Sequence, residues 1–322
     1  MRHSALRLAL TGCAVLALSA CVTESPKVAV VEQPAVIAEA SHEQLLADVR
    51  ILSADDMEGR DTGSAGGEKA RNYIVSRLDA MGVQPAPFGR LQRFEAPGRT
   101  REGVKTFNGV NIIGFIPGTR VADRYIVITA HYDHVGINGG QIFNGADDNA
   151  SGVATMLELA ARLKASPPEH SVLIVALDGE ERGLLGAREF VASPPVPLAA
   201  MSLNLNFDMI SRAETDGHLW VTGTYQNPNL RPILEVLPAN GAVSLAFGKD
   251  TPQDKEEDNW VDASDHAAFH EKGVPFLYLG VDYHPDYHRP SDDFERITPS
   301  VFISASELAI AAFHALDKAL DR

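Results

Sequence analysis

An α/β fold, with a mainly parallel sheet covered by helices, is predicted by two features of the 322-residue sequence. Short apolar runs alternate with segments of helical periodicity along most of the chain. Two of these runs, at 125–130 and 172–177, are almost continuously apolar, which is typical of strands buried on both faces of a parallel sheet. Strands that alternate with helices in this way form layered α/β domains.

The individual elements are expected in the following order. Helical periodicity begins near Ser41, a suitable N-cap, and recurs at 67–81, 153–164 and 300–320. Apolar runs predict strands at 111–116, 125–130, 172–177, 203–208, 219–222 and 275–279. No internal repeat or inserted domain interrupts this order in the sequence, so a single domain is predicted.

The composition argues against two classes of protein. Hydrophobic residues make up 45% of the chain and charged residues 22%, so the chain can build a core and is not of the disordered class. The 28 Lys and Arg residues are outnumbered by 43 Asp and Glu residues, which gives a formal net charge of −15. Because such a surface repels phosphates and the sequence has no basic patch, no nucleic-acid partner is expected.

The N-terminus is interpreted as a targeting segment. Arg2 and Arg7 precede a short apolar run at 8–20, too brief for a membrane-spanning helix. The sequence Leu-Ser-Ala-Cys at 18–21 resembles the lipobox of bacterial lipoproteins, and an ordinary secretory signal cut near residue 20 is the alternative. The resemblance implies a signal peptide at 1–20 and a lipid anchor on Cys21. Residues 21–40 would form a tether, and residues 41–322 the folded domain.

The resemblance to lipoproteins also has consequences for location and for metal binding. Because Val22 is not Asp, retention at the inner membrane is not signalled, and an anchor in the outer membrane that faces the periplasm or the exterior is expected. The chain has only two cysteines, Cys13 and Cys21, and both would be lost or lipidated on maturation. A metal site in the mature domain would therefore use histidine and carboxylate ligands.

Polar side chains follow three of the predicted strands at the point where each strand ends. The sequences are His-Tyr-Asp-His at 131–134, Asp-Gly-Glu-Glu at 178–181 and Asp208, and further polar segments lie at 144–152 and 287–292. In open α/β sheets, ligands bind beyond the carboxyl ends of the strands. Charged groups placed against buried strands are costly unless they are paired or bind a metal ion.

Two imidazoles and three or four carboxylates suit Zn²⁺ or another borderline divalent cation. Two such ions about 3.5–4 Å apart need a shared ligand, and a carboxylate can bridge them whereas an imidazole cannot. Of the adjacent glutamates, Glu180 and Glu181, one can bind a metal ion while the other remains free to accept a proton. These residues therefore predict a two-metal hydrolytic site.

Eight stretches of the sequence carry a family resemblance. They occur in family order between residues 52 and 297: MEGRDTGSAGGEKA, NIIGFIPG, HYDHVG, NGADDNASGVATMLELA, DGEERGLLGA, NFDMI, SDHAAFHEKGVPFLYLG and YHRPSDDFERI. The chain resembles the co-catalytic two-zinc aminopeptidases, the family of secreted bacterial leucine aminopeptidases that also includes glutamate carboxypeptidase and the glutaminyl cyclases. This implies a single α/β/α domain with a mixed, mainly parallel central sheet, the phosphorylase/hydrolase-like fold of zinc peptidases.

The resemblance also implies a role for each motif residue. The implied ligands of the two Zn²⁺ ions are His131, Asp148, Glu181, Asp208 and His288, with Asp148 as the bridge. The implied catalytic residues are Glu180 as general base, Asp133 as the group that orients His131, and Tyr287 as a donor to the oxyanion. Asp147 is expected to be a loop residue and His134 a non-ligand. His284 is the rival of His288, and Asp265 and His266 are expected to shape the site wall.

The activity that the resemblance implies is the hydrolysis of N-terminal residues from peptides with a free N-terminus. A water molecule bridged by the metal ions would be deprotonated by Glu180 and would attack the scissile carbonyl. A carboxypeptidase and a glutaminyl cyclase are the alternatives within the family. A lipoprotein that binds peptides or metal ions without catalysis is the alternative outside it.

Overall fold

A computed structural model of the chain describes residues 35–87, 89–100 and 102–321. The predicted signal peptide, the lipobox and Cys21 lie outside the described residues, as does most of the predicted tether. The first helix, α1 (Ala35–Leu52), begins six residues before the expected start at Ser41.

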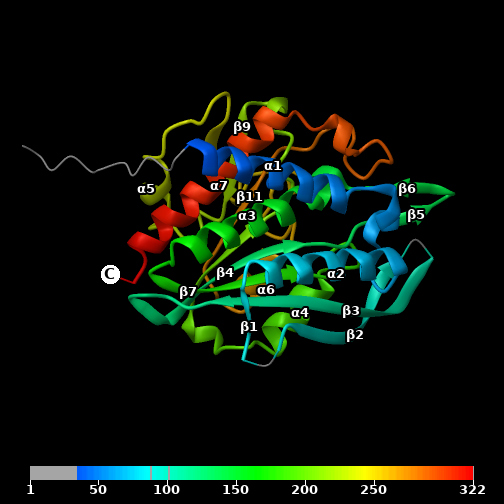
Figure 1. Cartoon of the computed structure of the whole chain (residues 1–322), viewed down its shortest axis with the longest axis horizontal. Helices are drawn as coiled ribbons and strands as arrows, with labels where there is room; N and C mark the ends of the chain where they lie inside the picture. The colour runs from blue at the N-terminus through cyan, green and yellow to red at the C-terminus, as the bar shows by residue number, and fades with distance from the viewer. Residues whose placement is uncertain (1–34, 88, 101, 322) are drawn as a thin grey trace, which may run out of the picture.

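A mixed nine-stranded sheet forms the centre of the described residues (Figure 1). Its strands, in spatial order, are β1 (Gln84–Pro85), β3 (Gly103–Ile116), β7 (His170–Leu177), β4 (Val121–His131), β8 (Met201–Phe207), β11 (Phe276–Gly280), β9 (His218–Thr222) and β10 (Ser244–Phe247), with β2 (Leu91–Thr100) paired to β3. The four central strands, β7, β4, β8 and β11, are parallel. A separate hairpin is formed by β5 (Gly136–Asn138) and β6 (Gln141–Phe143).

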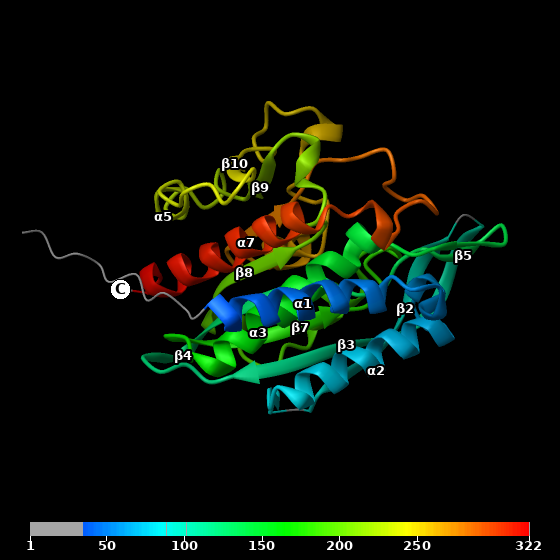
Figure 2. The same cartoon turned by 45° about the horizontal axis from the view of Figure 1, so that its top comes forward.

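Helices cover both faces of the sheet. One face carries α1, α2 (Ala65–Ala80), α3 (Gly152–Ala165), α5 (Arg231–Leu234) and α7 (Pro299–Ala319), and the opposite face carries α4 (Leu185–Ala192) and α6 (His266–Glu271). Figure 2 shows α1, α3 and α7 running side by side over the sheet. Short 3₁₀ segments lie at Asp55–Arg60, Leu198–Ala200, Ala213–Thr215, Glu256–Asp258 and Phe294–Arg296, and a π-helical turn lies at Ala146–Ser151.

The core consists of two layers, as expected when successive side chains of a strand point to opposite faces of a sheet. In β4, Ile126 and Ile128 join the cluster that also contains α1, α3 and α7, whereas Val127 joins the cluster beneath α4 and α6. All eight residues of β7 are buried. This confirms the predicted α/β/α architecture and explains why the strands at the centre appear as continuous apolar runs.

The sequence did not predict the edge strand β2 or the two helices, α4 and α6, on the second face of the sheet. The strand β2 alternates exposed and buried residues and contains Pro97 and Gly98, so it does not resemble a buried strand. Helices α4 and α6 have only eight and six residues, too short to show a clear helical period.

The helix α7 is long and apolar enough, by length and composition, to cross a membrane. Half of the apolar stretch of α7 is buried within the described residues. There Phe302 and Phe313 are fully buried against neighbouring elements. Its apolar character is explained by this packing, since a helix that closes a core needs a broad apolar face.

Candidate metal centre

The side chains singled out in the sequence come together at the carboxyl edge of the parallel strands. His131 is the last residue of β4, Asp208 directly follows β8, and Glu180 and Glu181 lie in the turn after β7. His288 comes from the long connection that follows β11. This edge is where ligands bind in open α/β sheets, and the sheet order explains why segments far apart in sequence meet there.

Asp148 lies between two histidines and faces each with a different oxygen. Its Oδ1 is 3.3 Å from Nε2 of His131, and its Oδ2 is 3.0 Å from Nε2 of His288. The residue sits in the π-helical turn Ala146–Ser151, followed by a cis peptide bond to Asn149. The Asn149 side chain donates to the carbonyl of Phe207 at the end of β8, at 2.9 Å, and so fixes this turn against the sheet.

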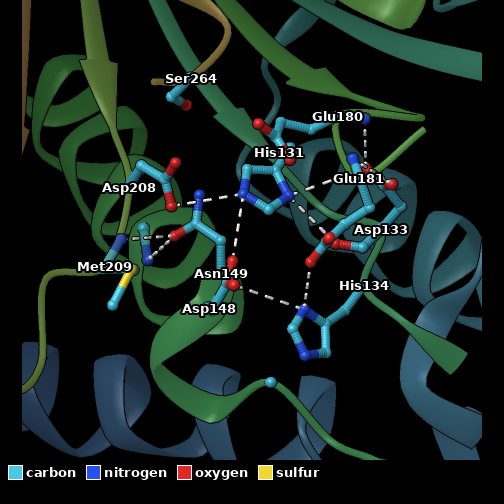
Figure 3. Close-up of polar contacts among 12 residues, drawn as sticks. His131, Asp133, His134, Asp148, Asn149, Glu180, Glu181, Asp208, Met209 and Ser264 are labelled. Carbon is cyan, nitrogen blue, oxygen red and sulfur yellow. Dashed lines mark hydrogen bonds and ion pairs between the residues drawn. The ribbon is translucent and has the colours of Figure 1, made fainter. Parts of the chain in front are cut away.

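Two sets of ligand atoms share Asp148. The first group consists of His131, Asp148 and Asp208, and the second group consists of His134, Asp148, Glu181 and His288. Within each group the ligand atoms lie within 4.8 Å of one another. In the first group, Nε2 of His131 is 3.3 Å from Oδ1 of both aspartates (Figure 3).

The second group is equally compact. The Oε1 atom of Glu181 is 2.8 Å from Nδ1 of His134 and 3.2 Å from Nε2 of His288. Glu181 Oε1 and both ring nitrogens of His134 are buried, and none of them has a hydrogen-bond partner with acceptable geometry among the described residues. Buried polar atoms are normally satisfied, so these orphaned atoms indicate a missing ligand such as a cation.

The electrostatics of the two groups also fit divalent cations. Burial would raise the pKa of Asp148, but the neighbouring histidines hold it well below its usual value. Burial and Asp148 would raise the pKa of Glu181, but His134 and His288 lower it to about 2. Ionised carboxylates and imidazoles that converge on one point are the donor set that zinc and similar ions prefer. The residues present therefore fit a pair of metal ions.

Asp133 lies behind His131. Its backbone carbonyl is 3.1 Å from Nδ1 of His131, whereas its carboxylate Oδ1 is 3.7 Å away. The carboxylate accepts hydrogen bonds from the backbone N–H groups of Glu180 at 3.0 Å and of Glu181 at 3.3 Å, and from the Thr62 hydroxyl at 3.2 Å. The residue therefore contacts the imidazole chiefly through its backbone and holds the glutamate turn with its side chain.

Glu180 belongs to neither group and lines the same cavity as the first group. Burial and the neighbouring carboxylates Glu181, Asp265 and Asp208 raise its pKa well above its usual value, against the lowering effect of His131. A raised pKa suits a carboxylate that must accept and release a proton near neutral pH. His288 also lines the cavity, and the remaining lining residues are apolar or aromatic: Met209, Trp260, Ala263, Tyr278, Val281, Tyr283 and Tyr287.

Tyr287 and His284, the alternative to His288 as a metal ligand, lie in different surroundings. The ring of Tyr287 stacks on that of His288, with the centroids 4.0 Å apart, and also lines the cavity. His284 instead lies 3.0 Å from Asp147, through its Nε2 atom, and neither residue belongs to a metal-binding group. Asp147 also accepts hydrogen bonds from the backbone N–H and the hydroxyl of Ser211, both at 2.7 Å. This pair therefore supports the loop that carries Asp148.

A buried arginine was missed in the sequence. Arg60 is fully buried and has a left-handed backbone conformation, with φ of 54°. Its guanidinium donates to the carbonyls of Leu52 at 2.7 Å, Tyr132 at 2.8 Å, Asn144 at 2.5 Å and Gly145 at 2.9 Å. It thereby joins the loop after β4 to the loop that carries Asp148. The only sequence signal for its importance is that Arg60 lies in the first family motif, MEGRDTGSAGGEKA, and this motif alone does not predict a buried arginine.

Asp265 and His266 were expected to shape the site wall, but neither is among the residues that line the cavity. Asp265 is fully buried and neither of its oxygens has a hydrogen-bond partner among the described residues. Burial raises its pKa to about 7, while His131 lowers it and Asp208 raises it. His266 is also buried, and its Nε2 atom is 2.8 Å from the carbonyl of Trp260 in the cavity wall.

Known proteins resemble this chain in sequence. Aminopeptidase YwaD of Bacillus subtilis (strain 168) is 30% identical over 218 residues, which cover 63% of this chain and 44% of that protein. The probable lipoprotein aminopeptidase LpqL of Mycobacterium tuberculosis is 28% identical over 277 residues, which cover 77% of this chain and 53% of that protein. The chain thus spans about half, or less, of the length of these curated relatives.

Solved structures share the fold. The crystal structure of BSAP, a zinc aminopeptidase from Bacillus subtilis, matches with a TM-score of 0.68 over 87% of this chain and 95% of that chain, at 20% sequence identity.

The family model for peptidase family M28 matches residues 111–313, which is more than half of the chain and includes every member of both groups. This confirms the family resemblance that the eight motifs indicate, and the chain belongs to peptidase family M28.

Proposed function

We propose that the chain is a metal-dependent aminopeptidase that holds two zinc ions and removes N-terminal residues from peptides. The observation that carries this proposal is the position of Asp148, which belongs to both groups. A fourth carboxylate, Glu180, belongs to neither group and lines the cavity beside Asp148. Three protein ligands in the first group leave room for a further ligand there, as catalytic zinc sites require.

Bound ions would supply a Lewis acid for the scissile carbonyl and lower the pKa of a water molecule beside it. Glu180 would take the proton of the attacking water and deliver it to the leaving amine. Asp133 would hold the turn that carries Glu180, through the hydrogen bonds to its backbone. Tyr287, which lines the cavity, would donate a hydrogen bond from its hydroxyl to the oxygen on which negative charge develops.

A free N-terminus is the substrate end that this cavity suits best. The ammonium group of a peptide is cationic at neutral pH. Asp148 and Asp208 would bind the metal ions, so Glu180 is the lining carboxylate that stays free to contact such a group. The aromatic wall of Trp260 and Tyr283 gives an apolar side chain a surface to contact. The relatives named as aminopeptidases support the same choice.

A panel of substrates tests the proposed activity. We expect the full chain to hydrolyse aminoacyl-anilides, to leave N-acetylated anilides and C-terminal substrates intact, and to lose activity reversibly when a chelator removes the metal ions. Metal content measured by mass spectrometry should be about two zinc ions per chain, the number that two groups require. Activity on blocked peptides would contradict the aminopeptidase assignment. A single bound ion together with cyclisation of N-terminal glutamine would favour the glutaminyl cyclase alternative.

We further propose that the mature protein is anchored to the cell envelope through lipid on Cys21. The support is the lipobox-like sequence at 18–21 and the similarity to LpqL, which is named a probable lipoprotein. Cells given labelled fatty acid should label the wild-type chain, and the Cys21→Ser variant should remain unlabelled and leave the membrane fraction. Equal labelling of both chains would contradict the anchor.

A further inference from the structure

The two groups differ in the number of side chains that the protein supplies. The first group has three members, whereas the second has four because it includes His134, which lies three residues after His131. Figure 3 shows the ring of His134 turned toward Glu181 and Asp148. Its Nδ1 atom is 2.8 Å from Oε1 of Glu181 and 3.7 Å from Oδ2 of Asp148.

The distances between the ligand atoms of the second group match those between two ligands of a single metal ion. Zinc binds nitrogen and oxygen at about 2.0–2.2 Å, so two ligands of a tetrahedral ion lie about 3.3 Å apart. The four measured separations in the second group are 2.8, 3.0, 3.2 and 3.7 Å. These four separations scatter around the expected value, and the two contacts of His134, at 2.8 and 3.7 Å, lie on either side of it.

Apart from its contacts with Glu181 and Asp148, the ring of His134 is held by packing among the described residues. The residue is fully buried, and neither ring nitrogen has a hydrogen-bond partner of acceptable geometry among the described residues. Gly145 packs against the ring, because a Cβ at that position would lie 2.6 Å from the ring carbons. The ring of His288 meets it at 64°, with the centroids 5.7 Å apart. The packing thus holds the ring with its Nδ1 atom facing the carboxylates of Glu181 and Asp148.

We propose that His134 is a fourth protein ligand of the second metal ion, through its Nδ1 atom. This inference rests on the metal centre of the proposed function and deepens it. A site with four protein ligands is closed, like the structural zinc sites of other proteins, whereas a site with three keeps an open position. The two ions therefore have unequal roles: the second group holds its ion tightly and the first group presents its ion to the substrate.

The test must separate two roles of His134: that of a metal ligand, and that of a hydrogen-bond donor that only orients Glu181. A thiolate placed at position 134 can replace a ligand but cannot replace an N–H donor. The His134→Cys variant suits this test, since Sγ takes the position of Cγ, one bond short of Nδ1, and zinc–sulfur bonds are longer, about 2.3 Å against about 2.0–2.1 Å.

The test uses the full chain loaded with Co²⁺, whose thiolate complexes absorb in the near ultraviolet. We expect the His134→Cys variant to show this charge-transfer band and the wild type to lack it. Because both chains contain Cys13 and Cys21, a difference between them reports on position 134. The matched control is His170→Cys, since His170 is also fully buried beside carboxylates, Asp317 and Asp321, but lies at the opposite end of β7. It should show no band.

Metal affinity provides the second readout. In His134→Ala we expect one of the two bound zinc ions to be weakened by more than about 100-fold, beyond what the loss of an orienting group causes. His170→Ala should keep both affinities. The inference requires both results: a missing thiolate band, or weakening of less than about 100-fold, overturns it while leaving the aminopeptidase proposal intact. A wild-type chain that binds no metal would overturn the proposed function itself.

Discussion

The Glu180→Gln variant should retain both metal ions and lose most of its turnover, with kcat lowered by about 10²–10⁴-fold, the usual contribution of a positioned general base. The amide keeps the size and shape of the side chain but cannot accept a proton. Glu180 is not a member of either metal-binding group, so its charge is not needed to hold an ion. The measurements are metal content and kcat for an aminoacyl-anilide.

The neighbouring glutamate provides the contrasting variant. Glu181 lies 2.8 Å from His134 and 3.2 Å from His288 within the second group. Glu181→Gln removes the charge of a proposed ligand, so it should reduce metal content as well as turnover. The exposed Glu271, paired with Arg188 on the surface, serves as control, and Glu271→Gln should leave both quantities unchanged. Near-normal turnover of Glu180→Gln would remove Glu180 from the mechanism.

The separation of these two adjacent carboxylates is a consequence of the turn after β7. Asp133 accepts hydrogen bonds from the backbone of both residues, which fixes their direction. One side chain then meets the histidines of the second group, and the other lines the cavity. The pKa of Glu181 is lowered to about 2, by His134 and His288 against burial and Asp148, whereas the pKa of Glu180 is raised well above its usual value by burial and nearby carboxylates. The same residue type thus acquires two opposite properties.

The central part of the fold and the positions of the candidate ligands could be predicted because their signals are local. Continuous apolar runs at 125–130 and 172–177 identify strands buried on both faces, and polar residues that follow such runs must reach the carboxyl edge of the sheet. His131 and Asp208 owe their positions to this geometry alone. No further knowledge of the tertiary contacts was needed to expect them together.

Other features depend on contacts between distant segments and leave no local signal. The aromatic wall combines Trp260, from an irregular segment, with Tyr283 and Tyr287, from the connection after β11. Neither segment has a hydrophobic period, so their approach to the cavity is decided by tertiary packing. His134 is similar: whether its ring turns toward Glu181 depends on Gly145, eleven residues later in the chain. The sequence therefore predicted a non-ligand, whereas the structure places His134 in the second group.

The Arg60→Met variant should be destabilised by at least about 3 kcal/mol, because four buried carbonyls lose a strong donor and each such loss costs about 1–3 kcal/mol. Methionine keeps the length of the side chain but has no donor. The carbonyl of Gly145 also accepts from the backbone of Ala150, so its loss is partly offset. The free energy of unfolding in urea measures the effect.

The same change should also weaken metal binding, since the guanidinium joins the carbonyls of Tyr132 and Asn144 and thereby holds the loop of Asp148 against the end of β4. Arg60→Lys offers only three donors on a point charge and should fall between the wild type and Arg60→Met. Arg188→Met, which removes a half-exposed surface pair, should change the unfolding free energy by less than about 1 kcal/mol. If Arg60→Met were as stable and as rich in metal as Arg188→Met, the buried guanidinium would not be what positions the loop that carries Asp148.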